Sequence, residues 1–134
     1  MRRYDRIESV TFDGDALPLP LSVRLSRRGE PLPAAGDGEP FATSVQLGAA
    51  TIAAEIRLRG LAAAEELILG CRGDLAIVLG AADGYHRRTV RLFGAVLVAV
   101  EHAYEQAAMA TALLRFVAEA ADGDEDPFVA EETA

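Results

Sequence analysis

The side chains that most often carry chemistry are scarce in this chain. His86 and His102 are the two histidines, and Cys71 is the single cysteine. A zinc site built from three histidines is therefore excluded, and Cys71 alone cannot begin a zinc knuckle. His86 stands beside Arg87 and Arg88, and His102 follows an apolar run, so we expect both to be solvated or to cap a turn. A single thiol also excludes an internal disulfide, and Cys71 is expected to be a small buried apolar side chain.

All thirteen basic residues are arginine. The absence of lysine excludes a P-loop lysine, a Schiff-base lysine and a lysine general base. Neither a Gly-x-Ser-x-Gly elbow nor a Gly-x-Gly-x-x-Gly turn occurs in the sequence. We therefore expect a protein that is not an enzyme, with no catalytic residue and no cofactor.

One acidic run has the spacing of a calcium loop. Asp122, Asp124 and Asp126 match the first ligands of such a loop. The sixth position, which needs glycine for its sharp turn, is Pro127, and the twelfth is Thr133 rather than glutamate. We therefore expect no metal site.

The arginines form two groups that could contact a partner. Arg57 and Arg59 share the outward face of one predicted strand, and Arg87, Arg88 and Arg91 gather at a predicted hairpin and the strand after it. Three interpretations stay open. One is pairing across strands with an acidic residue, namely Glu55, Glu101 or Glu119. The second is salt bridges between subunits. The third, a nucleic-acid patch, is disfavoured because no aromatic residues interleave these arginines and the net charge is −8.

The negative charge is concentrated at the C-terminal end. Seven of the 21 acidic residues follow residue 118, and no basic residue does. Such a segment is typical of a solvated tail and disfavours phosphate binding there. We expect one domain at residues 1–121 and an acidic C-terminal tail at residues 122–134, in which Pro127 ends regular backbone pairing.

Alternation of apolar and polar residues predicts most of the chain to be β-strand. Residues 61–69 have helical propensity and pattern, with Gly70 as a C-terminal stop. The sequence Ala82-Asp83-Gly84-Tyr85 has the strongest hairpin signal. The expected strands are residues 7–12, 21–26, 44–47, 51–59, 74–79, 88–93, 96–101 and 110–118.

The C-terminal third has the longest alternating pattern. Within residues 108–119 every even position is apolar, which predicts a strand with one face on a core. Residues 89–101 alternate likewise, with Val90, Leu92, Val96, Val98 and Val100 on one face; we expect a bend at Gly94 rather than a bulge. A competing interpretation is one long helix over residues 95–121, which are rich in alanine, leucine and glutamate.

Residues 27–41 hold three prolines and three glycines with almost no periodicity, which predicts a long loop, functional or disordered. The expected fold class is mainly β: an antiparallel β-sandwich or partly open barrel with one short α-helix and a long loop.

The layout of residues 51–118 resembles the tail-tube-fold proteins of long-tailed bacteriophages, which share their fold with the tubes of contractile injection systems and type VI secretion. The matching pieces are the strand 51–59, the helix 61–69, the strand 74–79, the Ala82-Asp83-Gly84 hairpin, and the strands 89–93, 96–101 and 110–118. The predicted loop 27–41 falls where that family has its long stacking loop.

The resemblance implies hexameric rings that stack through the long loop, with a lumen for DNA that is not bound sequence-specifically. The partners would be further copies of the chain and other tail proteins, without a membrane. The chain would be made in the host cytoplasm and located in the virion tail. The candidate subunit-interface residues are Arg28, Glu30, Leu32, Phe41, Arg57, Arg59, Arg88 and Arg91. Three alternatives remain: a tail terminator or baseplate-end component, a monomeric β-barrel binding module, and a small helical adaptor built on residues 95–121.

Overall fold

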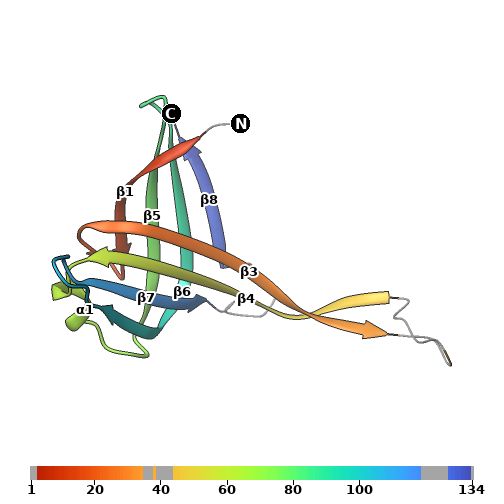
Figure 1. Ribbon diagram of the computed structural model, residues 1–134. Coiled ribbons are helices and arrows are strands. Elements are labelled where there is room, and N and C mark those ends of the chain that lie inside the picture. Colours follow the sequence, from red (N-terminus) through yellow and green to blue (C-terminus); the bar gives the residue numbers. More distant parts are fainter. Residues whose placement is uncertain (1–2, 35–37, 39–43, 119–126, 134) are drawn as a thin grey trace.

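One antiparallel sheet makes up most of the structure, a computed structural model in which residues 3–34, 38, 44–118 and 127–133 are described (Figure 1). Its strands follow the order β2-β1-β5-β6-β7-β4-β3, and β8 pairs with β6 beside this path. The elements are β1 (Tyr4–Phe12), β2 (Asp15–Ala16), β3 (Pro20–Ala34), β4 (Ser44–Arg59), α1 (Ala62–Glu65), β5 (Arg72–Ala81), β6 (Arg87–Ala103), β7 (Thr111–Ala118) and β8 (Phe128–Thr133). The predicted fold class, mainly antiparallel β with one short helix, is confirmed.

The sheet bends so that its two halves enclose a core. In Figure 1, β1, β5 and β8 rise steeply, whereas β3, β4 and β7 lie across them. Strand β6 belongs to both halves, because its first part pairs with β5 and β8 and its second part pairs with β7. The sheet does not close into a barrel: a hollow of about 370 Å³ separates β1 from β3 and is lined by Ile7, Val23 and Leu25 among others.

Alternate residues of β4 and β7 contribute one side of the core, and residues of β1, β5 and β6 complete it. The inward residues of β7 are fully buried from Ala112 onward, as the period of two predicts, whereas Ala108 precedes the strand and is exposed. Phe116 packs against Phe12 with ring centroids 4.7 Å apart. The buried members of the two strands are Ile52, Ala54, Ile56, Leu58, Ala112, Leu114, Phe116 and Ala118. Since these residues lie in paired strands, the alternative of a helix over residues 95–121 is wrong.

Two bulges in β6 change which side chains face the core. The register moves from Gly73 opposite Ala95 to Leu75 opposite Leu92, so β6 carries one extra residue at Gly94. A second shift follows Leu97. Ala95 and Leu97 are therefore buried, whereas Val98 is 50% exposed. The predicted face is correct at Val90 and Leu92 and wrong at Val96 and Val98, and a bulge rather than a simple bend occupies Gly94.

Gly94 supplies the left-handed backbone that the first bulge requires. Its φ is +67°, and its N–H donates to the Asp74 carboxylate at 3.2 Å. A β-branched side chain is disfavoured at this φ, whereas asparagine tolerates it. We expect Gly94→Val to lower the free energy of unfolding by about 1–3 kcal/mol and Gly94→Asn to lower it by clearly less, as measured by urea denaturation. Equal losses in the two variants would contradict this account.

The predicted loop at residues 27–41 is wrong over its first half. Residues 27–34 continue β3 and pair with β4 as far as Ala34 opposite Ser44. Pro31 and Pro33 are two residues apart, so the N–H groups that they lack would point to the same edge of β3. Because β3 is the last strand of the sheet, that edge can be the outer one, where no neighbouring strand needs the donors. Local turn-forming residues are tolerated there because β4 supplies the backbone hydrogen bonds on the other edge.

The helix is shorter than predicted. Four residues, Ala62–Glu65, are helical instead of residues 61–69, and Ile68 and Leu69 are exposed. A short helix depends on tertiary packing for its stability, and Ala64 is the one residue of α1 that is fully buried.

Pro127 does not end backbone pairing, contrary to the prediction. Strand β8 follows it and pairs with β6 from Leu92 opposite Phe128 to Arg87 opposite Thr133. Pro127 needs no N–H to begin the strand, and its carbonyl accepts the N–H of Phe93 at 3.0 Å. Residues 128–133 therefore belong to the sheet, while the candidate calcium ligands at 122, 124 and 126 lie outside the described residues.

Candidate assembly interface

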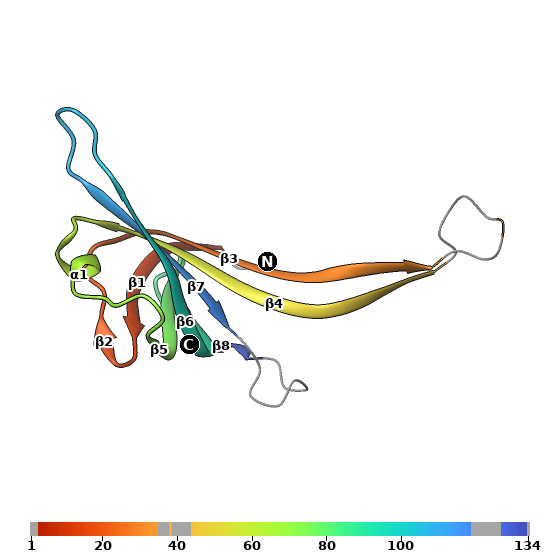
Figure 2. The same cartoon turned by 90° about the horizontal axis from the view of Figure 1, so that it is seen from below.

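The β3–β4 hairpin projects far from the rest of the sheet. Figure 2 shows its distal part, residues 28–34 and 44–51, standing clear of the other strands. Over these residues β3 pairs with β4, and β4 pairs with β7 only from Ile52 onward. Within the described part of the chain, the distal hairpin therefore leaves both of its outer edges unpaired. An unpaired edge can accept another strand, and the β4 edge does so more readily than the β3 edge, from which Pro31 and Pro33 remove two donors.

Three of the predicted interface residues, Arg28, Glu30 and Leu32, belong to β3 of this hairpin. Arg28 is exposed on β3 opposite Thr51. Leu32 of β3 is the register partner of Gln46 in β4, and Glu30 lies at a register shift between Gly29 and Pro31. Phe41 lies outside the described residues. At the base of the hairpin, the Arg27 guanidinium lies 5.2 Å from the centre of the Phe128 ring, so β8 contacts β3 there.

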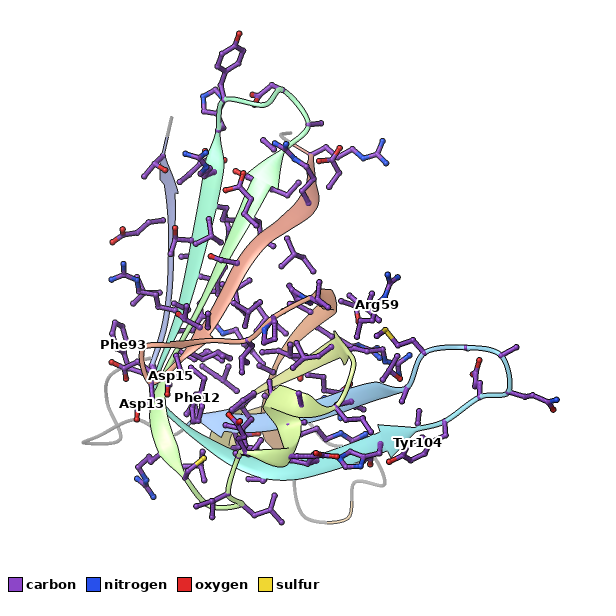
Figure 3. All side chains as sticks on the ribbon, turned by 90° about the vertical axis from the view of Figure 1, so that its left-hand side faces the viewer. Phe12, Asp13, Asp15, Arg59, Phe93 and Tyr104 are labelled. Carbon is purple, nitrogen blue, oxygen red and sulfur yellow. The ribbon has the colours of Figure 1, made fainter. Side chains whose placement is uncertain are left out.

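Arg57 and Arg59 do share the outward face of β4, and both are exposed. They line a hollow of about 470 Å³ where β4 ends and β7 begins. We call this the arginine hollow; its lining residues are Leu21, Arg57, Arg59, Ala103, Glu105, Ala108, Met109 and Thr111. Figure 3 shows Arg59 on the side of the β6–β7 connection away from Tyr104. Among the described residues, neither guanidinium lies within 4.0 Å of a carboxylate.

The second arginine group is divided between two faces. Arg88 is half-buried and has the same parity in β6 as the buried Val90, whereas Arg87 and Arg91 point the other way and are exposed. Arg87 pairs with Glu8 of β1 at 2.7 Å. The structure therefore does not bring Arg88 and Arg91 together.

Sequence reasoning missed the arginine that pairs with the predicted acidic partners. Arg115 of β7 lies 3.2 Å from Glu55 of β4 and 3.8 Å from Glu101 of β6. Arg115 lies directly opposite Glu55 in the β4–β7 register, so this pair could have been predicted if the pairing of the two strands had been known. All three side chains are well exposed, so each pair contributes about 0–1 kcal/mol, and the network mainly aligns charges on the outer face.

The β5–β6 turn is held by one carboxylate, as the Asp-Gly hairpin signal predicts. Asp83 accepts the N–H of Tyr85 at 2.8 Å and that of His86 at 3.0 Å, and its other oxygen lies 2.6 Å from Nδ1 of His86. These hydrogen bonds, with the backbone bond from His86 as the largest effect, lower the pKa of Asp83 well below its usual value of 3.8. The turn presents Tyr85 with most of its side chain exposed, and His86 caps the turn as expected.

Loss of the Asp83 carboxylate is expected to loosen this turn. We expect Asp83→Ala to speed the hydrogen exchange of the Tyr85 and His86 amides, whereas Asp83→Asn, which keeps one acceptor oxygen, changes exchange less. Because the folded pKa is lowered, the contribution of the carboxylate is present above pH 3.8 and is lost only as the pH falls through the lower folded value. Exchange rates that slow or stay unchanged in Asp83→Ala would contradict this role.

The remaining candidate ligands do not form a metal centre within the described residues. No group of three or more histidine, cysteine or carboxylate side chains there could hold an ion. His102 lies 3.3 Å from the Tyr104 hydroxyl, and Cys71 is half-buried against the core. In the same part of the chain, no helix has the length and apolar character needed to cross a membrane.

Three solved structures resemble nearly the whole chain, each at 13% sequence identity. The first is a chain of the sheath–tube complex of PVC, an extracellular contractile injection system, in the extended state; the TM-score is 0.61, and the match covers 93% of this chain and 88% of that chain. The second is from the tube-terminating cap of the anti-feeding prophage, with a TM-score of 0.60 and coverage of 93% and 87%.

The third is from the baseplate of the anti-feeding prophage, with a TM-score of 0.54 and coverage of 98% and 93%. The chain has the tail-tube fold. The resemblance inferred from the layout of residues 51–118 is thereby confirmed at the level of the fold. No family model and no curated protein matches the sequence of this tail-tube-fold chain.

Proposed function

We propose that this chain is a structural subunit of a tail tube, assembling into stacked hexameric rings around a channel for DNA. The observation that carries the proposal is the projecting β3–β4 hairpin on a tail-tube fold, with both outer edges of its distal part unpaired in the described residues. In a monomeric protein, a long hairpin with unpaired edges promotes aggregation. In a protein that assembles with copies of itself, the same edges can form the contacts between subunits.

The charge distribution supports passage of a polyanion without tight binding. The chain carries a net charge of −8. On the outward face of β4, β7 and β6, Arg115 is paired with Glu55 and Glu101, while Arg57 and Arg59 are exposed. A subunit with a net negative charge repels phosphates over long range, so DNA would slide past it.

A role at one end of the tube is the second candidate. The tube-terminating cap superposes almost as well as the sheath–tube complex, with TM-scores of 0.60 and 0.61. A terminal component would use the same fold to form a ring but would leave one face of that ring without a further ring of its own kind.

Light scattering after size-exclusion chromatography, followed by negative-stain microscopy, tests both candidates. A tube subunit is expected to form rings whose stacks lengthen with protein concentration. A terminal component would stop at single rings. A monodisperse monomer at high concentration would overturn both and favour a monomeric β-barrel binding module.

A further inference from the structure

The arginine hollow and the acidic segment lie at opposite ends of the same strand. Arg59 of the hollow is opposite Thr111, the first residue of β7, whereas residues 119–126 follow Ala118, the last. Residues 119–126 contain Glu119, Asp122, Asp124, Glu125 and Asp126 and no basic residue. The molecule thus has a cationic site at one end of β7 and the start of an anionic segment at the other.

The start of the acidic segment is separated from the arginine hollow of its own chain by the length of β7. Seven residue steps separate Ala118 from Thr111 along β7, which is about 23 Å in a strand. Asp122 is four residues from Ala118, and four extended residues span about 14 Å. The later acidic residues are held closer still to Pro127, whose carbonyl accepts the Phe93 N–H at the Ala118 end of the sheet. Asp122 would therefore reach Arg59 of its own chain only with the segment and both side chains fully extended, whereas the segment of a second copy is under no such constraint.

We propose that the arginine hollow of one copy binds the acidic segment 122–126 of a second copy. The contact joins unlike ends of identical chains, so it is heterologous. Such a contact extends a stack when the rotation between copies does not close a ring. The inference rests on the proposed function, because stacking of rings would bring the two ends of neighbouring copies together. The contact would act in addition to the stacking contacts expected of residues 27–41.

The charges that face the hollow favour an anionic occupant. Arg57 and Arg59 are two cations against Glu105, the one carboxylate that lines the hollow in the described structure. The nearby Glu55 and Glu101 are already paired with Arg115. Leu21 and Met109 give the hollow an apolar wall, against which Ala120 and Ala121, which precede the acidic residues, can pack.

The tip of the β3–β4 hairpin is the competing occupant, and its charge fits less well. Residues 35–43, between the register partners Ala34 and Ser44, hold two acidic residues, whereas residues 119–126 hold five; neither segment contains an arginine. The segment with more carboxylates is attracted more strongly to the two guanidinium groups of the hollow.

A charge-swap experiment separates this contact from the rest of the assembly. We expect Arg57→Glu/Arg59→Glu to leave rings but abolish their stacking, and Asp122→Arg/Asp124→Arg/Asp126→Arg to do the same. A chain carrying both sets of substitutions should stack again, as should an equimolar mixture of the two variants. The matched control, Arg3→Glu/Arg72→Glu, reverses two exposed arginines elsewhere and should stack normally. Failure of both the combined chain and the mixture to recover would overturn the contact. Asp37→Arg/Glu39→Arg in place of the 122–126 set would restore stacking only if the hairpin tip were the occupant.

A binding measurement tests the contact even if the wild-type chain forms no rings. A synthetic peptide of residues 118–128 is added to the ¹⁵N-labelled full chain, and amide shifts are followed by NMR. We expect shifts at Arg57, Arg59 and Thr111 that weaken as salt is raised. Arg57→Glu/Arg59→Glu should weaken the affinity by about tenfold or more. Absence of shifts at these residues, or equal affinity in that variant, would overturn the inference and leave the proposed function to be judged by ring formation alone.

Discussion

Removing residues 29–50 and joining Arg28 to Thr51 through an Asn-Gly turn is expected to abolish assembly while the remaining chain still folds. Arg28 and Thr51 are register partners, so a two-residue hairpin turn can join them. The core residues named above, on β4 from Ile52 onward, on β7 and at Phe12, all lie outside residues 29–50. The deletion removes the two open edges and little else, so we expect a folded monomer by size-exclusion chromatography with light scattering and by circular dichroism.

A smaller deletion serves as the matched control for this prediction. Trimming only residues 35–43, between the register partners Ala34 and Ser44, keeps the paired edges of the hairpin. If the edges carry the contact, this variant still assembles; if the tip carries it, assembly is lost in both variants. Tubes formed by the chain that lacks residues 29–50 would refute the role of the hairpin.

Phe116→Ala is expected to cause the largest loss of stability of any single substitution discussed. The Phe116 side chain is completely buried and packs tilted against Phe12. Truncating a buried phenylalanine leaves a cavity and costs about 3–5 kcal/mol, a large part of the roughly 5–15 kcal/mol by which domains are stable. Urea denaturation followed by circular dichroism measures the change in the free energy of unfolding.

Two further variants keep the Phe116 prediction falsifiable if the alanine variant does not fold. Phe116→Leu leaves a smaller cavity and should cost less than Phe116→Ala. Tyr104→Ala removes an aromatic side chain that is 69% exposed and should change stability by about 0.5 kcal/mol or less. A loss for Phe116→Ala as small as that for Tyr104→Ala would show that the ring does not hold the two halves of the sheet together.

Several features could be predicted from local patterns. The apolar faces of residues 52–58 and 112–118 were predicted correctly, because side chains in a strand alternate between core and solvent whatever strand lies beside them. The Asp83-Gly84 turn was also predicted correctly, since its geometry depends on the residues of the turn itself. Arg57 and Arg59 were placed on one outward face by the same alternation.

Features that depend on a distant partner could not be predicted in this way. The bulges at Gly94 and after Leu97 exist because β6 pairs with β5 in one half and with β7 in the other, and local alternation shows neither partner. Alternation alone places Arg88 and Arg91 on opposite faces of β6. The Arg115–Glu55 pair could be predicted only from the register between β7 and β4.

The sequence by itself determined that this chain is a β-protein with one short helix, apolar faces along residues 52–58 and 112–118, and thirteen arginines with no lysine. The tertiary structure decided the length of the β3–β4 hairpin, the return of β8 onto β6, and the separation of the arginine hollow from the acidic segment by the length of β7. The physical reason is that the polarity of each side chain can be read directly from the sequence. The hydrogen-bond partner of a backbone N–H in a sheet, in contrast, belongs to a strand that can lie far away in the chain. Pro31 and Pro33 are acceptable, and Pro127 can begin a strand, only because of where those other strands lie.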